Sequence, residues 1–359
     1  MLIIDGSFGE GGGQIVRTSL SLSAITGSAV TIENIRAGRE KPGLRPQHLT
    51  GALAIVEICR GDIEGAEVGS SKLVFHPHAV KGGSYEFDVS KTQASAGSVN
   101  LILQTIIWPL AFAQRRSRVV IKGGTHIPYA PTSDYIDNVF LPTVARMGLP
   151  CDYHVAKCGH YPEGGGEVRF DIRPVEALRP IKLNARRQPL SVDLTSAVSN
   201  LPLSIAQRQM DAGMQLLTET FREQVPETPV QGCPETSVAG EIKQYPSPGK
   251  GTLFFALARS GDIRAGFQSL GELKKRAEKV ATEACEELLA YVDTGKALDK
   301  HLADQLIVPM ALAGPGSSFT TCEITQHLLT NIAVVEKFLD GHFHISHGLG
   351  QPGSVELRH

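Results

Sequence analysis

The stretch EGGGQIVR at residues 10–17 returns almost unchanged as EGGGEVRF at residues 163–170. Consecutive glycines adopt backbone conformations that other residues avoid, so each copy predicts a tight turn. The first copy stands between a short apolar segment, residues 2–4, and a pattern typical of a helix from about Gln14. Two such turns suggest duplicated β/α units, although short glycine runs also recur by chance.

Outward from these turns, short apolar strands alternate with amphipathic helices along the whole chain. This order indicates an α/β or α+β fold. The order of expected elements changes at about Ile181. Residues 181–283 carry strands of their own and a long helix, and the earlier alternation resumes after them. We therefore expect a large domain made of residues 1–180 and 284–359, interrupted by a smaller inserted α/β domain.

The charges of the chain nearly cancel, since 35 Lys and Arg stand against 37 Asp and Glu, a formal net charge of −2. A protein that coats nucleic acid non-specifically should be basic, so a polyanionic partner would need a local basic patch. The longest apolar stretch, residues 101–113, is too short to cross a bilayer, and we expect no signal peptide and no membrane partner. Six scattered cysteines without a CxxC pair argue against a zinc site or a disulfide framework and fit a reducing cytosol.

Three motifs suggest sites that their spacing does not support. GEGGGQ at residues 9–14 lacks the final glycine of a dinucleotide-binding fingerprint. SPGKGT at residues 247–252 lacks the first glycine of a phosphate-binding loop and lies between two expected strands, which favours a hairpin turn. The alternating His342, His344 and His347 could bind a metal from one face of a strand, but a solvated strand is favoured.

Two segments near the start of the chain suit a phosphate group. Glu10 lies in the glycine-rich turn before a helix, where its carboxylate could hold a divalent cation against phosphates or serve as an ordinary capping acid. IRAGREKPGLRPQH, residues 35–48, gathers four cations within ten residues and ends in Gln47 and His48. Guanidinium groups bind phosphate through paired donors, although pattern alone favours a solvated loop.

The C-terminal third contributes a candidate nucleophile. His327 stands at the head of an amphipathic helix, and Asp304 and Gln305 stand near the start of an apolar one. A helix N-terminus disfavours a cationic imidazole, so it would help to keep His327 neutral and nucleophilic. The alternative is a capping or partly buried histidine, and the pattern alone favours this alternative.

Taken together, these segments are more specific than any one of them. In their order and spacing they resemble the RNA 3′-terminal phosphate cyclases, and the similarity weakens only in the inserted region and after Leu339. The segments are GSFGEGGGQIVRTSLSLSAITG, IRAGREKPGLRPQHLT, GGTHIPYAP, GHYPEGGGEV, HLADQLIVPMALAG and HLLTNIAVVEKF. The resemblance implies an α+β fold in which three repeated β-α-β-α-β-β units form a large domain that carries a smaller inserted α/β domain.

The resemblance also implies an ATP-dependent reaction in three steps. His327 would attack the α-phosphorus of ATP and form a histidine–AMP intermediate, and the RNA 3′-phosphate would then take the AMP. The neighbouring 2′-hydroxyl would finally displace AMP and leave a 2′,3′-cyclic phosphate, a step favoured by the proximity of the two groups.

The resemblance assigns further roles to individual residues. Glu10 matches a metal-binding acid for Mg²⁺ or Mn²⁺. Arg17, Arg39 and Gln47 match positions that contact the RNA terminal phosphate, with His48 beside them. The ATP-binding positions are Gln104, Pro131, Phe255, Asp304 and Gln305, and Asp304 is also next to the nucleophile.

Two alternatives to a cyclase are kept. Cyclase-like RNA-binding proteins of ribosome assembly share the fold but lack the nucleophilic histidine, and the presence of His327 favours the enzyme. Enolpyruvyl transferases are built from similar repeats, but we find no motif for their phosphate-binding lysines. We expect a cytoplasmic enzyme whose partner is RNA with a 3′-terminal phosphate and which needs no obligatory protein partner.

Overall fold

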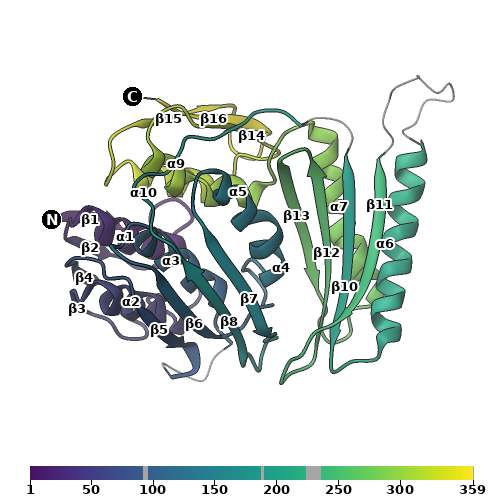
Figure 1. The fold of residues 1–359 in the computed structure, drawn as a ribbon, viewed down its shortest axis with the longest axis horizontal. Helices are drawn as coiled ribbons and strands as arrows, with labels where there is room; N and C mark the ends of the chain where they lie inside the picture. The colour runs from purple at the N-terminus through teal and green to yellow at the C-terminus, as the bar shows by residue number, and fades with distance from the viewer. Residues whose placement is uncertain (92–95, 187–189, 224–235, 359) are drawn as a thin grey trace.

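The computed structural model describes residues 1–91, 96–186, 190–223 and 236–358. Within these residues the chain forms four four-stranded sheets, each mixed in strand direction, with helices packed against them (Figure 1). This architecture of small mixed sheets and helices is compatible with the α+β class expected from the sequence. None of the helices in the described ranges is both long enough and apolar enough to cross a membrane.

The first sheet has the strand order β1-β2-β4-β3, in which β1 and β2 are parallel and the other neighbours are antiparallel. Helix α1 connects the parallel pair and ends at Gly27, whose φ of 72° closes the helix in the left-handed region. The strands are β1 (Leu2–Asp5), β2 (Val30–Glu33), β3 (Asp62–Glu64) and β4 (Leu73–His76), and the helices are α1 (Gly13–Thr26) and α2 (Pro46–Cys59).

The second sheet repeats this pattern as β5-β6-β8-β7, again with its first two strands parallel. Helix α3 begins at the cap residue Ser98, whose hydroxyl accepts a hydrogen bond from the N–H of Leu101. The strands are β5 (Ser84–Asp88), β6 (Ser117–Gly123), β7 (Cys151–Lys157) and β8 (Gly166–Ile172). The helical segments are η1 (Val89–Lys91), α3 (Val99–Ala111), α4 (Ser133–Tyr135), η2 (Ile136–Phe140) and α5 (Leu141–Arg146).

The third sheet joins distant parts of the chain in the order β15-β16-β14-β9. Its β9 and β14 are parallel, and β16 and β15 follow in antiparallel pairs, so the three sheets share one pattern of strand directions. The strands are β9 (Lys182–Leu183), β14 (Ser318–Thr321), β15 (His342–Ser346) and β16 (Gly353–Arg358), and the helices are α8 (Lys300–Gln305), α9 (Ile307–Ala313) and α10 (Gln326–Val335).

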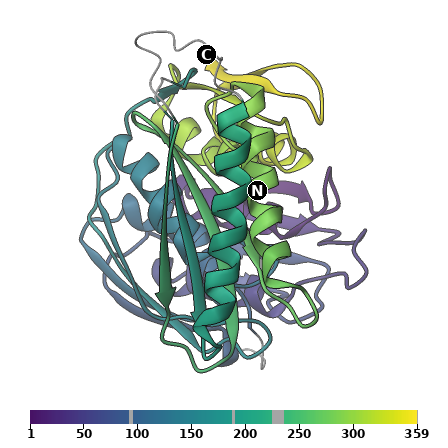
Figure 2. The ribbon, with the colours of Figure 1, turned by 90° about the vertical axis from the view of Figure 1, so that its right-hand side faces the viewer.

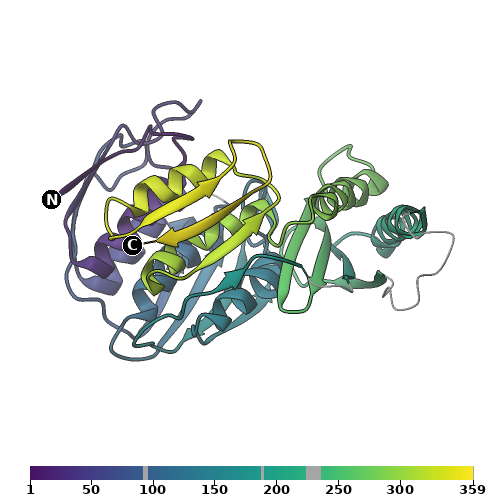
Figure 3. The ribbon, with the colours of Figure 1, turned by 90° about the horizontal axis from the view of Figure 1, so that it is seen from above.

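The fourth sheet is formed by the chain between β9 and β14, in the order β11-β10-β12-β13. Helices α6 and α7 pack against each other and against this sheet, and Figure 2 shows them side by side in front of it. Viewed from above, the fourth sheet and its helices lie at the end of the molecule remote from the two termini (Figure 3). The strands are β10 (Ser191–Ser199), β11 (Ser237–Gln244), β12 (Gly251–Ser260) and β13 (Ile263–Leu270), and the helices are α6 (Leu203–Glu223) and α7 (Ala277–Thr294).

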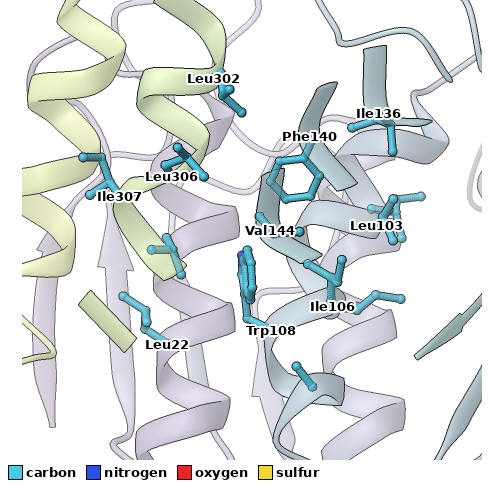
Figure 4. Close-up of a cluster of buried hydrophobic side chains, with 14 of the residues drawn as sticks. Leu22, Leu103, Ile106, Trp108, Ile136, Phe140, Val144, Leu302, Leu306 and Ile307 are labelled. Atoms are coloured by element: carbon cyan, nitrogen blue, oxygen red, sulfur yellow. The ribbon is translucent and has the colours of Figure 1, made fainter. Parts of the chain in front are cut away.

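Helices from the first three sheets meet in one apolar core. Side chains of α3 face those of η2 and α5 on one side and those of α8, α9 and α1 on the other (Figure 4). Trp108 of α3 is almost fully buried and meets Phe140 edge-on, with ring centroids 6.2 Å apart. Helix α1 contacts α3 and α10, and α10 contacts α9. Residues from all three sheets can therefore converge on one site.

The two EGGG stretches are not equivalent in the structure. Residues 10–13 lead into helix α1, whereas residues 163–166 turn between strands β7 and β8 of an antiparallel pair. Both contain glycines with positive φ, as the composition predicts, at Gly11 and at Gly164. Their likeness therefore reflects similar turn chemistry, and the interpretation of the echo as a repeated β/α unit is wrong for this pair.

The structure also bears on expectations for the SPGKGT loop, the C-terminal histidines and the cysteines. SPGKGT does not form a hairpin turn, because β11 and β12 lie on opposite sides of β10 and the loop between them crosses from one side to the other. The strand expected at the C-terminal histidines is β15, which carries the exposed His342 and His344; His347 is also exposed but follows the end of the strand at Ser346. The cysteines within the described ranges are free thiols, and Cys233 lies outside those ranges.

Candidate active site

The candidate active site begins where the glycine-rich loop, residues 6–13, lies against helix α10. Gly9 has a φ of 59°, and a Cβ at this position would collide with the hydroxyl of Thr330 in α10. The backbone N–H of Glu10 donates to the same hydroxyl over 3.2 Å. Glycine is therefore required for the close approach of loop and helix, and this approach brings Glu10 beside His327.

Helix α10 presents His327 in its first turn. The hydroxyl of the cap residue Thr325 accepts a hydrogen bond from the N–H of Leu328, which fixes the start of the helix. The side chain of His327 remains 46% exposed, so an incoming group can reach the ring. The sequence prediction of a histidine at the head of this helix is confirmed.

A glutamine amide fixes the tautomer of His327. The Nε2 group of Gln14 lies 2.6 Å from Oδ1 of Asp304, and Oε1 of Gln14 lies 2.6 Å from Nδ1 of His327. A carboxylate only accepts hydrogen bonds, so the amide nitrogen must face Asp304 and the amide oxygen must face the ring. Nδ1 of His327 therefore carries the hydrogen, and in the neutral ring Nε2 keeps its lone pair.

The surroundings of His327 favour the neutral ring. Burial lowers the pKa of His327; the charges of Arg17 and Arg39 lower it further, and Asp304 opposes them. Burial also raises the pKa of Asp304, which is opposed by His327, His301, Arg17 and Gln14. A neutral imidazole with a free nitrogen is the form that can act as a nucleophile.

Glu10 and Arg39 lie in front of Nε2 of His327. Oε2 of Glu10 lies 2.6 Å from Nε2 of His327, and its other carboxylate oxygen pairs with the guanidinium of Arg39. Arg39 also donates to the backbone carbonyl of Glu10 over 3.1 Å. A predicted metal ligand, a predicted phosphate-binding arginine and the predicted nucleophile therefore meet at one point.

The protein groups around Glu10 could hold a cation only together with oxygen atoms of a bound phosphate ligand. Within the described ranges, no group of three or more His, Cys, Asp or Glu side chains is placed to hold a metal ion by itself. Mg²⁺ typically takes one or two carboxylates and completes its shell with phosphate oxygens and water. The single carboxylate of Glu10 fits this kind of site, and it does not fit an ion held by protein groups alone.

A cavity of about 580 Å³ extends inward from His327, between α1, α3 and α8. Three of its lining side chains, Ser21, Gln104 and Gln305, have a buried polar atom without a hydrogen-bond partner. Gln104 offers an Nε2 donor and Gln305 an Oε1 acceptor. Buried polar atoms are normally paired, so this cavity is suited to a ligand that carries both an acceptor and a donor.

Arg17 gives the cavity a positive charge. It lies one turn along α1 from Gln14 on the cavity face, and burial lowers its pKa to about 10, opposed by the charge of Asp304. An arginine with this pKa remains cationic at neutral pH. The cavity therefore suits an anionic ligand whose apolar part is held by the inner walls.

His48 lies behind the glycine-rich loop, and its neighbour Gln47 contacts the start of α3. His48 is buried against Gly13, and its Nδ1 accepts a hydrogen bond from the backbone of Arg45. Burial lowers the pKa of His48 well below its usual value, and the neighbouring arginines lower it further. Oε1 of Gln47 accepts from the N–H of Ser98 at the start of α3. His48 therefore supports the glycine-rich loop, Gln47 supports the start of α3, and the contact of either residue with RNA stays a prediction.

The other predicted ATP-binding residues divide between the cavity and the core. Pro131 lines the cavity, and its carbonyl accepts from Nδ2 of Asn100 over 2.9 Å. Phe255 of β12 does not belong to the described cavity lining, since its ring is buried behind Gly266. A role for Phe255 in ATP binding stays a prediction.

The sequence interpretation missed three residues of this site. Gln14 lies within the quoted glycine-rich motif, and its i, i+3 spacing to Arg17 could have placed both on one helix face. His301 lines the cavity from α8 and meets Tyr135 edge-on. Gln268 of β13 carried no local signal, because only the packing of the fourth sheet brings it to the cavity.

Comparison with known proteins identifies the relatives of this chain. The model of a family described as RNA 3′-terminal phosphate cyclase matches residues 8–345. A protein of Nostoc punctiforme with this name is 44% identical over 341 residues, which are 94% of each chain. Proteins with the same name from Pyrococcus abyssi and Desulfurococcus amylolyticus are 39% and 38% identical and cover 99% and 100% of this chain and 98% of their own.

Proposed function

The chain belongs to the RNA 3′-terminal phosphate cyclase family, and on this premise we propose that it converts an RNA 3′-phosphate to a 2′,3′-cyclic phosphate at the expense of ATP. It is an enzyme of the ligase type that forms a covalent histidine–AMP intermediate. The observation that carries the proposal is the hydrogen-bonded chain Asp304–Gln14–His327, which holds the hydrogen on Nδ1 and turns Nε2 of the histidine toward Glu10, beside a cavity with unpartnered polar atoms.

In the first step, Nε2 of His327 attacks the α-phosphorus of ATP, the P–N bond forms, and pyrophosphate leaves. Gln14 holds the proton on Nδ1, so the ring enters the reaction in the reactive tautomer and the developing positive charge is stabilised through Gln14 by Asp304. Arg17 and the N-termini of α1 and α10 add positive potential where phosphate charge gathers.

In the second step, an oxygen of the RNA 3′-phosphate attacks the phosphorus of histidine–AMP, and Nε2 of His327 leaves with its electron pair. In the third step, the adjacent 2′-hydroxyl attacks the 3′-phosphorus, its proton is released, and AMP leaves. The two reacting groups sit on the same ribose, which makes this closure effectively unimolecular.

Glu10 is the proposed holder of a divalent cation, Mg²⁺ or Mn²⁺. Such an ion supplies charge neutralisation on the phosphate oxygens when it is bound. The carboxylate of Glu10 contacts both Arg39 and Nε2 of His327. Engagement of Glu10 by a cation would therefore release both the guanidinium and the nucleophilic nitrogen.

The two substrates are proposed to approach His327 from different sides. The nucleotide occupies the cavity, with Gln104, Gln305, Pro131 and Asp304 around it, and the unpartnered amide atoms suit the polar edge of an adenine. The RNA terminal phosphate meets Arg39, with Arg17 reaching it from the cavity side. His48 supports the glycine-rich loop from behind, and Gln47 is beside His48 in α2.

The domain organisation is part of the same proposal. Three repeated β-α-β-α-β-β units would form the large domain, which the shared strand pattern of the first three sheets supports. The inserted domain would end after Thr294 and not at 283, because α7 (Ala277–Thr294) packs as one helix on β12 and β13. We further propose a cytoplasmic location and no obligatory protein partner.

An adenylylation assay tests this function and separates the three classes. The protein incubated with ATP labelled at the α-phosphate should become covalently labelled, and the same ATP labelled at the γ-phosphate should leave no label. Added RNA with a 3′-phosphate should discharge the label and acquire a cyclic end. A cyclase-like assembly protein or an enolpyruvyl transferase would take up no label from either nucleotide, and that result would contradict the proposal.

A further inference from the structure

Tyr129 is an exposed aromatic residue at the mouth of the nucleotide cavity. It belongs to the cavity lining, yet its relative exposure is 105%, so its ring has no packing of its own. Its φ is 61°, in the left-handed region that residues with a side chain rarely adopt because of steric strain. Tyrosine therefore holds a costly backbone position where it makes no compensating contact within the protein.

The backbone on the C-terminal side of Tyr129 is held firmly. Nε2 of Gln268 donates to the carbonyl of Ala130, and Nδ2 of Asn100 donates to the carbonyl of Pro131. Oε1 of Gln268 accepts from both the N–H and the hydroxyl of Thr132. The direction in which the tyrosine ring leaves the backbone is therefore set by the scaffold before any ligand arrives.

We propose that Tyr129 is a stacking residue that closes over the purine ring of the bound nucleotide. The unpartnered amide atoms of Gln104 and Gln305 can bind the edge of a base, but they leave its faces without partners. An aromatic ring at the cavity mouth supplies an apolar face, and stacking on it would bury the exposed ring. The inference rests on the proposed use of this cavity for ATP.

The location of Tyr129 favours the nucleotide over the RNA as its partner. Tyr129 shares the cavity with Gln104, Pro131 and Gln305. Arg17, which is proposed to reach the RNA terminal phosphate, lines the cavity beside His327, whereas Arg39 and His48 lie on the glycine-loop side of His327 and outside that lining. A ring that served an RNA base would be expected on that side.

Calorimetric titration of the full chain with AMP and, separately, with ribose 5-phosphate tests the proposal, because the second ligand lacks the base. Tyr129→Ala should weaken AMP binding about fivefold, at the low end of base–aromatic stacking, and leave ribose 5-phosphate unchanged. Tyr129→Phe should bind AMP like the wild type. Leu273→Ala removes another exposed apolar side chain, outside the cavity lining, and should have no effect on either ligand.

Tyr129→Gly separates stacking from backbone strain. It should lose AMP affinity as Tyr129→Ala does, yet melt at a higher temperature than Tyr129→Ala, because glycine accepts the left-handed φ without strain. Kinetics provide the second readout: Tyr129→Ala should raise the KM for ATP in self-adenylylation and leave kcat and the KM for RNA 3′-phosphate unchanged.

The results that would overturn the proposal are specific. Unchanged AMP affinity in Tyr129→Ala would exclude stacking on the nucleotide, and a raised KM for RNA alone would assign the ring to the RNA. Loss of affinity for ribose 5-phosphate together with AMP would show that the substitution disturbs the cavity itself. Failure of the proposed function would look different, since the wild type itself would then take up no label from ATP.

Discussion

Two histidines of this protein each lie against a carboxylate, and the two pairs have opposite surroundings. Nε2 of His327 is 2.6 Å from Glu10, and Nε2 of His126 is 2.7 Å from Asp134. The side chain of His327 is 46% exposed, whereas that of His126 is 1% exposed. The first pair faces a cavity, and the second is enclosed where the loop after β6 meets the segment after β11.

In the enclosed pair, His126 and Asp134, both ring nitrogens and both carboxylate oxygens have a hydrogen-bond partner. Nδ1 of His126 lies 2.7 Å from the hydroxyl of Thr125, and the hydroxyl of Tyr245 donates to the second oxygen of Asp134 over 2.6 Å. Burial lowers the pKa of His126, but hydrogen bonds to Asp134 and Cys158 outweigh it and raise the pKa to about 10. His126 is therefore a charged, fully paired residue that joins the second sheet to the fourth.

The proposed nucleophile and the enclosed histidine differ in pKa and in their remaining partners. At His327 the pKa is lowered, one nitrogen is held by an amide, and the carboxylate on the other nitrogen already has a competing partner in Arg39. At His126 both nitrogens are held and the ring is charged. The presence of a carboxylate alone does not decide between the two roles; burial and the remaining partners do.

Substitution of His327 should have the greatest consequence, a loss of self-adenylylation. His327→Asn should fold normally and lose self-adenylylation by more than about a thousandfold, because the group that forms the P–N bond is gone. Uptake of α-labelled ATP measures the loss, and the exposed His342→Asn serves as a matched control that should keep full labelling. Labelling of His327→Asn at the rate of the wild type would refute the assignment.

Removal of the structural histidine should affect stability and not chemistry. His126→Ala leaves the buried Asp134 without its cation, so we expect a loss of about 3–5 kcal/mol in the free energy of unfolding. Urea unfolding measures this loss. The double variant His126→Ala, Asp134→Asn should recover part of it, since no uncompensated buried charge remains. Equal losses in the single and double variants would show that the pair is not coupled.

Substitution of Gln14, whose side-chain amide contacts His327, should lower the rate of self-adenylylation less than substitution of His327 itself. Gln14→Ala removes the acceptor that fixes the tautomer of His327, and we expect kcat for self-adenylylation to fall about 10- to 100-fold, as for other residues that orient a reactive imidazole. The KM for ATP should change little, because Gln14 acts through the histidine. A raised KM with unchanged kcat would instead make Gln14 a substrate-binding residue.

The last expected effect is a pH dependence confined to the structural pair. The pKa of His126 is raised above its ordinary value of 6.5 to about 10, so its contribution to stability is complete below pH 6.5 and is lost as the pH rises toward 10. The pKa of Asp134 is lowered, so its contribution persists above pH 3.8 and is lost only in acid. His160, which lies beside His126, has a pKa lowered to about 4 by burial and stays neutral in this range.

Urea unfolding between pH 6.5 and 10 measures this dependence. The difference in stability between the wild type and His126→Ala should shrink by at most about 1.4 kcal/mol per pH unit, the limit for one proton. A difference that is constant over this range would show that His126 is neutral in the folded protein.

The elements of the fold could largely be anticipated from local patterns, and their partners could not. The apolar run at residues 2–4 and the helical pattern from about Gln14 place β1 and the start of α1 close to their observed bounds, because each element buries a face that the sequence displays. The EGGG echo misled, since the same turn chemistry serves a strand-to-helix turn at residues 10–13 and a strand-to-strand turn at residues 163–166. Local composition fixes the conformation of a turn, and the elements beside it fix its role.

The site shows the same limit. His327, Asp304 and Glu10 were recognisable because their segments resemble a known family, and on pattern alone a capping or buried role was favoured for His327. Contacts between residues more than a hundred positions apart, such as Gln268 with Thr132 or Asp134 with Tyr245, depend on how the fourth sheet packs. No periodicity or spacing in the sequence predicts them.

The most direct test is to map the adenylyl group after the wild-type protein is incubated with ATP and divalent cation. Digestion under conditions that preserve P–N bonds, followed by mass spectrometry of the peptides, identifies the modified residue. The half-exposed, amide-oriented histidine should carry the AMP, so the adduct should lie on the peptide that contains His327 and be absent from the peptide that contains His126. An adduct on any other residue, or none at all with active protein, would contradict the account.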